Sequence, residues 1–170
     1  MPVVLQTDRL VLGELTFEDA EFIVELLNDA AFVRFIGDKG VRNVADAREY
    51  LRKGPMDSYR RNGFGLYRVN RKADDCRVGM CGLVRREGLD HPDVGFAFLP
   101  AHRDMGYASE SAAAVIRHAR QELGIGRILG ITHPDNDGSI RLLERAGFAF
   151  ERRLRLAPGA DEVNLYVNDK

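Results

Sequence analysis

The fold is decided by residues 96–110, which read FAFLPAHRDMGYASE. An alternating apolar segment ends at Leu99, a short loop follows, and a pattern with helical spacing starts at Gly106. A helix start exposes backbone amides without partners and carries a partial positive charge, so it binds phosphate readily. Gly106 has no Cβ, and the backbone can therefore come close to a ligand there. A plain strand-to-helix connection, in which Gly106 serves only the turn, fits the same spacing.

Two neighbours of Gly106 favour the phosphate interpretation. Arg103 supplies a fixed positive charge that can fork to phosphate oxygens. Ala108 has a small side chain and keeps the first turn of the helix open.

The segments on both sides of this loop predict an α/β chain. Alternating or apolar stretches predict strands over residues 9–14, 64–70, 76–85, 93–99, 127–132, 148–156 and 162–168. Helical spacing and capping residues predict helices over residues 17–30, from 44 to a break or kink at Gly54-Pro55, 106–123 and 136–146. This order implies one domain, residues 1–170, with helices on both faces of a central mixed sheet.

Composition restricts the class of protein. The 170 residues are 45% hydrophobic and 30% charged, with a net charge of −1, which is typical of a globular chain without a general attraction to nucleic acid or anionic membrane. Residues 1–13 lack the long apolar run of a signal peptide, and no stretch is long enough to span a membrane. The two cysteines exclude a disulfide scaffold, and the histidine spacing predicts no metal site. We expect a cytoplasmic protein.

The loop resembles a known signature. Arg103-Asp104-Met105-Gly106-Tyr107-Ala108 is similar to the Arg/Gln-x-x-Gly-x-Gly/Ala motif of the GNAT acyl-CoA-dependent N-acyltransferases. Other segments resemble this family in the same order, and the first of them is similar to the branch that includes ribosomal-protein N-terminal acetyltransferases. These segments are residues 5–10 with 18–20, 78–83, 93–96, and 136–139 with 144–148.

The resemblance implies the GNAT fold, with a mostly antiparallel twisted sheet of about six to seven strands and about four helices. It also implies direct transfer of an acetyl group from acetyl-CoA to a primary amine, without an acyl-enzyme intermediate or a metal. The amine belongs to a protein N-terminus or to a small molecule. The residues expected to bind the cofactor are Phe98, Leu99, Arg103, Asp104, Met105, Gly106, Tyr107, Ala108, Asn136 and Ser139.

These residues have different implied roles. The loop amides between Arg103 and Ala108 cradle the pyrophosphate of coenzyme A. The backbones of Phe98 and Leu99 pair with the pantetheine amides, like an added strand, which requires the neighbouring strand to splay away. Asn136 hydrogen-bonds the pantetheine arm, although helix capping is an alternative role for it.

Asp93 is the candidate general base, because it opens the strand before the loop, where this branch commonly carries Glu. Its side chain is one methylene shorter than Glu, which favours a water relay. Turn chemistry after His91-Pro92 is the alternative role. Glu87 and His102 are weaker candidates for the base.

Ser139 is the candidate donor of a proton to the departing thiolate. Many relatives carry a Tyr donor where this sequence has Leu143, and Leu143 fits the core stripe of its helix. The proton therefore comes from Ser139 or from solvent.

Other residues have simpler interpretations. Cys81 lies in an alternating strand and is predicted to be a core residue. The arginine pairs Arg60-Arg61, Arg85-Arg86 and Arg152-Arg153 are predicted to be solvated. Some aromatic residues either wall the acceptor pocket or belong to the core, namely Tyr50, Tyr59, Phe64 and Tyr67.

The sequence leaves two functions open. The first is the N-acetyltransferase, with a homodimer suggested only by analogy. The second is a catalytically impaired CoA-binding sensor or interaction module, because the Tyr donor is absent and the Asp93 carboxylate is short. A nucleic-acid-binding module is disfavoured, since no basic stripe with interleaved aromatics is present.

Overall fold

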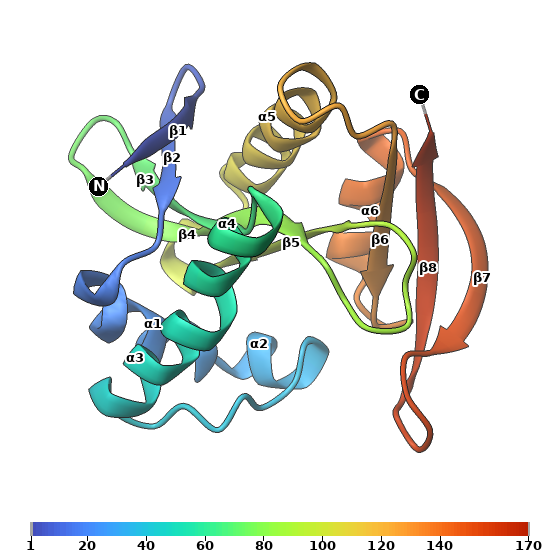
Figure 1. Ribbon diagram of the computed structural model, residues 1–170, viewed down its shortest axis with the longest axis horizontal. Helices are drawn as coiled ribbons and strands as arrows, with labels where there is room; N and C mark the ends of the chain where they lie inside the picture. Colours follow the sequence, from blue (N-terminus) through green and yellow to red (C-terminus); the bar gives the residue numbers. More distant parts are fainter. Residues whose placement is uncertain (1, 170) are drawn as a thin grey trace.

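Eight strands within residues 2–169, the part of the chain that the computed structural model describes, form one mixed sheet (Figure 1). Their order across the sheet is β1-β2-β3-β4-β5-β6-β8-β7. The strands are β1 (Val3–Gln6), β2 (Leu10–Glu14), β3 (Leu66–Arg71), β4 (Cys76–Val84), β5 (Asp93–Phe98), β6 (Arg127–Thr132), β7 (Ala149–Arg155) and β8 (Glu162–Asp169). The predicted mixed, mostly antiparallel sheet is confirmed, with a slightly higher strand count because the short β1 was not predicted.

The neighbouring strands are antiparallel except β5 and β6, which are parallel. A parallel pair needs a long crossover, and α5 (Tyr107–Gln121) provides it between these two strands. The loop that decides the fold therefore lies at the start of this crossover.

Helices flank the sheet on both faces. The remaining α-helices are α1 (Ala20–Leu27), α2 (Ala30–Phe35), α3 (Val44–Leu51), α4 (Asp57–Asn62) and α6 (Asp137–Arg145). One core cluster lies between the sheet and α5 and α6, and a second lies between the sheet and α1 to α3. No helix in the described part of the chain is long and apolar enough to cross a membrane.

The helices differ from the prediction at two places. The helix predicted over residues 17–30 is divided, because Asp29 accepts a hydrogen bond from Phe32 N at 3.1 Å and starts α2. The second α-helix is interrupted around Gly54-Pro55, as predicted, by a π-helical turn over Arg52–Met56, but the chain then continues directly into α4, which was not predicted. The number of helices is therefore higher than expected.

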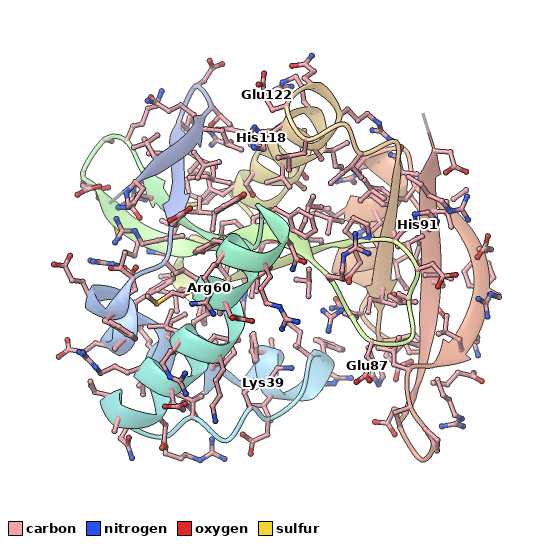
Figure 2. The ribbon with its side chains drawn as sticks, in the orientation of Figure 1. Lys39, Arg60, Glu87, His91, His118 and Glu122 are labelled. Carbon is pink, nitrogen blue, oxygen red and sulfur yellow. The ribbon has the colours of Figure 1, made fainter. Side chains whose placement is uncertain are left out.

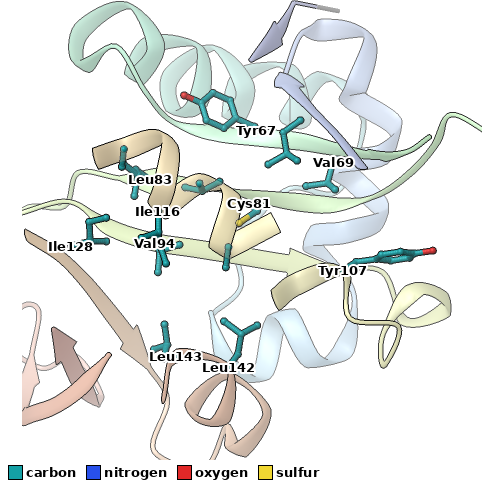
Figure 3. Close-up of a cluster of buried hydrophobic side chains, with 14 of the residues drawn as sticks. Tyr67, Val69, Cys81, Leu83, Val94, Tyr107, Ile116, Ile128, Leu142 and Leu143 are labelled. Carbon is teal, nitrogen blue, oxygen red and sulfur yellow. The ribbon is translucent and has the colours of Figure 1, made fainter. Parts of the chain in front are cut away.

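The larger core cluster contains Cys81 at its centre (Figure 3). Its side chain is fully buried, and burial raises the pKa of the thiol to about 12, so the thiol stays protonated at neutral pH. The prediction that Cys81 is a core residue is confirmed. Phe64 and Tyr67 belong to the same cluster, and Tyr59 stacks on Tyr67 with the ring centroids 5.7 Å apart.

Close strand packing explains one glycine of β4. A Cβ on Gly82 would lie 2.0 Å from the carbonyl oxygen of Gly65 and 2.8 Å from Leu66 Cα. We expect Gly82→Ala to lower the free energy of unfolding by about 2–3 kcal/mol, since backbone atoms must move to admit the methyl group. Urea denaturation measures this loss. Gly126→Ala is the matched control, because no atom lies within 4 Å of its added Cβ. An unchanged urea midpoint for Gly82→Ala would contradict this packing.

Candidate active site

A cleft of about 650 Å³ lies where β5 and β6 separate. The two strands pair at a single position, Asp93 with Leu129, and diverge beyond it. The cleft is bounded by β5, the loop after it, the first turns of α5 and α6, and residues of α2. It is lined by most of the predicted site residues, namely Asp93, Phe98, Arg103, Asp104, Gly106, Tyr107, Ala108, Asn136 and Ser139.

The loop before α5 presents a run of free backbone N–H groups. Within residues 2–169, the amides of residues 104–109 donate to no acceptor of the protein, and the first helical hydrogen bond runs from Glu110 N to the Gly106 carbonyl at 3.0 Å. Asp104 and Gly106 have left-handed backbone conformations, with φ of 60° and 80°. Free amides at a helix start, joined to such a turn, form a site for an anion.

Arg9 holds this loop from outside. Its Nη1 donates to the Met105 carbonyl at 2.9 Å, and its Nε pairs with Glu110 at 2.8 Å. Its guanidinium lies over the Tyr107 ring, 4.6 Å from the centroid. Thr7 donates to the same Glu110 carboxylate at 2.5 Å. The turn between β1 and β2 thus fixes the loop with the amides exposed.

Arg103 lines the cleft, but two of its guanidinium nitrogens already have partners in the protein, and the phosphate contact stays a prediction. Its Nε donates to the Phe98 carbonyl at 3.0 Å, and its Nη2 pairs with Asp29 at the start of α2. The side chain therefore connects the end of β5 to α2, and its charge is already compensated by Asp29.

The structure does not bring Leu99 and Met105 into the cleft lining. Leu99 N donates to the Val78 carbonyl at 3.0 Å, the Leu99 carbonyl accepts from His102 N at 2.9 Å, and the side chain is buried against α1 to α3. The Met105 side chain is exposed. Of these two residues, only Met105 contributes a free amide to the loop.

β5 presents an unpaired backbone edge to the cleft. Leu129 N donates to the Pro92 carbonyl at 2.9 Å, which shows that Pro92 faces β6. Backbone direction alternates along a strand, so Phe96 and Phe98 also face β6, where no described strand pairs with them. Because the Phe98 carbonyl is occupied by Arg103, the edge offers both backbone groups of Phe96 and the N–H of Phe98.

Asp93 lies at the vertex where the two strands meet. Its side chain is 1% exposed, and Oδ1 accepts a hydrogen bond from Arg86 Nε at 2.9 Å. Burial raises the pKa of the Asp93 carboxyl, and the charge and hydrogen bond of Arg86 only partly oppose this effect. A carboxylate with a raised pKa beside an open cleft can accept a proton.

The prediction that Arg86 is solvated is wrong. Its side chain is 33% exposed and paired with the buried Asp93. By contrast, Arg60 and Arg61 are 76% and 74% exposed, as expected for a solvated face, and Arg152 is 62% exposed. Arg86 is the second residue after β4, and the antiparallel pairing of Val84 with Asp93 brings it near the start of β5.

The alternative bases, Glu87 and His102, lie apart from the vertex, although His102 also lines the cleft. Glu87 is exposed in the loop between β4 and β5. His102 lies after the opposite end of β5, where its Nε2 is 3.7 Å from Cys76 Sγ. Neither has the position of Asp93 at the vertex.

Asn136 caps α6, because its Oδ1 accepts a hydrogen bond from Ser139 N at 3.2 Å. Both residues also line the cleft, so capping leaves the amide nitrogen of Asn136 and the hydroxyl of Ser139 available to a ligand. Leu143 is 1% exposed and packs in the core, as its spacing predicted.

Some cleft residues were not found from the sequence. Thr132 at the end of β6 lines the cleft, and its buried hydroxyl has no hydrogen-bond partner in the part of the chain that the structure describes. Phe35 of α2 meets His133 edge to face, with the ring centroids 5.7 Å apart, and both line the cleft. The available signal was the pair of polar residues at the end of a buried strand, with Thr132 as its last residue and His133 directly after it.

Comparisons with known proteins agree with this geometry. The sequence model of the family described as "Acetyltransferase (GNAT) domain" matches residues 9–149. The uncharacterized N-acetyltransferase YnaD of Bacillus subtilis is 26% identical over 147 residues, which cover 86% of this chain and 83% of YnaD. An acetyltransferase of the GNAT family from Bacillus anthracis has a TM-score of 0.80 at 24% identity, covering 99% and 98% of the two chains. The ribosomal L7/L12 α-N-protein acetyltransferase RimL, in complex with coenzyme A, has a TM-score of 0.85 at 16% identity, covering 98% and 97%.

Asp29 both caps α2 and pairs with Arg103. We expect Asp29→Ala to lower the free energy of unfolding by about 1–2 kcal/mol through loss of the cap. Asp29→Ser keeps a capping oxygen and removes the ion pair, so it should recover most of that loss. Urea denaturation of both variants gives the comparison. Equal destabilisation by the two substitutions would mean that Arg103, and not the cap, accounts for the effect.

Proposed function

Since the chain belongs to the GNAT acetyltransferase family, we propose that it transfers an acetyl group from acetyl-CoA directly to a primary amine of a protein N-terminus or a small molecule. One observation carries the proposal. The open edge of β5 has the unpartnered amides of residues 104–109 at one end and the buried Asp93 at the other.

In this proposal the diphosphate of coenzyme A binds the amides of residues 104–109. The support is the number of free N–H donors and the positive end of α5. RimL, which has the same fold, binds coenzyme A. The backbone supplies the binding groups, because Arg103 is engaged with Asp29.

The pantetheine arm then follows β5. Its amides pair with Phe96 and with the N–H of Phe98 as an added strand would. From Phe98 to Asp93 the strand rises about 17 Å, which carries an extended arm from the loop to the vertex. In the proposal Asn136, which lines the same cleft, contacts the arm with its amide nitrogen.

The chemical step takes place near Asp93. The neutral amine attacks the thioester carbonyl carbon, a C–N bond forms and the C–S bond breaks. Asp93 takes the amine proton through a water molecule. The departing thiolate receives a proton from the Ser139 hydroxyl or from solvent, since Leu143 is buried and carries no proton to donate.

A CoA-binding module without turnover is the second candidate on this fold. It predicts coenzyme A binding with no thiol release over a panel of peptides with varied N-termini, polyamines, aminoglycosides and amino acids. The transferase predicts thiol release with at least one of these amines. The buried carboxylate at the vertex favours the transferase.

Gly106→Glu tests the cofactor loop. The substitution adds a side chain and a negative charge where the diphosphate would bind, and we expect at least a 100-fold weaker affinity for coenzyme A in calorimetry. Gly124→Glu is the matched control, because Gly124 also has a positive φ of 68° and lies in the loop between α5 and β6. Normal binding by Gly106→Glu would mean that the anion binds elsewhere.

Asp93→Asn tests the base. We expect kcat to fall about 10²–10⁴-fold, with unchanged affinity for coenzyme A, because no carboxylate remains to accept the proton. In the native enzyme kcat falls as the pH drops through the Asp93 pKa. Because burial raises this pKa, kcat falls at a higher pH than an ordinary carboxyl would give. Asp93→Glu should retain activity, and its kcat should still fall as the pH drops. An Asp93→Asn enzyme with a kcat within twofold of native would exclude Asp93 as the base.

A further inference from the structure

A second cavity, of about 740 Å³, lies between α3, α4 and the end of β4. Arg86 lines both this cavity and the cleft between β5 and β6. Arg86 therefore borders both spaces, and its partner Asp93, beside which the proposed function puts the reacting amine, lines the cleft. The second cavity thus lies beside the residue that pairs with the candidate base.

Arg86 has unused hydrogen-bond donors at this junction. Its Nε donates to Asp93, but Nη1 and Nη2 donate to no acceptor among residues 2–169. The two Nη groups of a guanidinium form a planar fork that matches a carboxylate. One side of Arg86 thus holds the candidate base, and the other side is available to a ligand.

The second cavity also has an excess of positive charge. Its lining contains four basic side chains and two acidic ones: Lys53, Arg61, Arg85, Arg86, Asp57 and Glu87. Asp57 is already paired with Arg60 and Arg61. No carboxylate in the described residues pairs with Arg85. Lys53 pairs with Glu49 and Arg61 with Asp57, so the donors left for an anionic ligand are the Nη groups of Arg86 and the side chain of Arg85.

We propose, on the basis of the transferase function above, that the acceptor is a small amine with a carboxylate one or two carbons from its nitrogen, such as a free amino acid. The Nη groups of Arg86 hold the carboxylate, roughly 2.8 Å away. Because Asp93 lies against Nε of the same guanidinium, at 2.9 Å, the amine of such a molecule comes within reach of Asp93 directly or through one water. A longer spacing would carry the amine past the base.

The step balances for this acceptor. The amine nitrogen forms the C–N bond to the acetyl carbonyl carbon, and the C–S bond breaks. One amine proton passes to Asp93, and the thiolate is protonated from Ser139 or solvent. The products are an N-acetyl amino acid and coenzyme A.

The test compares matched acceptors with the full chain and acetyl-CoA. Glycine, L-alanine, L-serine, L-aspartate and β-alanine are each assayed beside the corresponding carboxamide, with thiol release as the readout. We expect kcat/KM for the acid to exceed that for the amide by roughly 10- to 100-fold, the usual effect of hydrogen bonds to a charged group. The amine of the amide is less basic and more of it is neutral, so amine protonation would bias the ratio in the opposite direction.

Variants of Arg86 test whether this residue recognises the carboxylate of the acceptor. Arg86→Gln should reduce the acid-to-amide ratio to near one, and Arg86→Lys should give an intermediate ratio, since it keeps the charge but loses the fork. Both acceptors use the same base, so any effect of Arg86 on Asp93 cancels in the ratio. Arg60→Gln is the control, because Arg60 is 76% exposed on α4 (Figure 2). This substitution removes the same charge and should leave the acid-to-amide ratio unchanged.

Several results would overturn the proposal. These are a native ratio at or below one, a native ratio that Arg86→Gln leaves intact, and faster turnover of polyamines, aminoglycosides or neutral peptide N-termini than of any amino acid. If no amine releases thiol, the transferase function fails, and calorimetry with N-acetyl-L-alanine and the CoA-bound protein tests the anion site itself. Binding that Arg86→Gln abolishes supports the site, and absence of binding by the native protein excludes it.

Discussion

The single parallel bridge between β5 and β6 is the constraint on which the site depends. Backbone N–H and C=O groups inside a protein need partners, and a strand in the middle of a sheet normally finds them on both sides. Here β4 pairs with the whole of β5, but β6 pairs with it only at Asp93 and then diverges. The divergence leaves a strand edge that an extended, amide-containing molecule can complete. It also places the start of α5, with its free amides, at the far end of the same edge.

Two buried aspartates, Asp19 and Asp93, differ in the number of hydrogen-bond donors around their carboxylates, and this difference determines whether each can take a proton. Burial pushes the pKa of Asp19 upward, but hydrogen bonds from Thr16 N, Arg77 and Arg68 outweigh it, and the pKa falls below its usual value. Asp19 thus stays ionised and fixes α1 to the sheet. Asp93 is buried to the same degree but has only the Nε of Arg86 among side-chain donors in the described chain, and its pKa is raised. A fully satisfied carboxylate holds its charge, whereas a partly satisfied one can take a proton.

Local patterns predicted most of the fold because they depend on neighbours in sequence. β6 has the predicted bounds, Arg127–Thr132, and β5 differs from its prediction by one residue. The division of α1 from α2 was missed because a short capping break is hidden inside a continuous apolar stripe. The pairing of Arg103 with Asp29 joins residues 74 apart in the chain, and no local pattern records such a contact. Arg86 was misjudged for a related reason, since its burial depends on how the strands beside it meet.

The proposed site has a cofactor half made of backbone groups and an acceptor half made of side chains. This difference decides how much of each half can be predicted from the sequence. In the proposed function the cofactor half consists of backbone groups of β5 and of residues 104–109, so it requires a glycine with positive φ and little else in side-chain identity. Such a requirement leaves a short, readable motif. The proposed acceptor half consists of side chains of α3, α4 and the loop after β4. These can change without disturbing the sheet, which is why one fold serves many acceptors. Arg86 lines both spaces, and in the proposal its charge ties the choice of acceptor to the ionisation of Asp93.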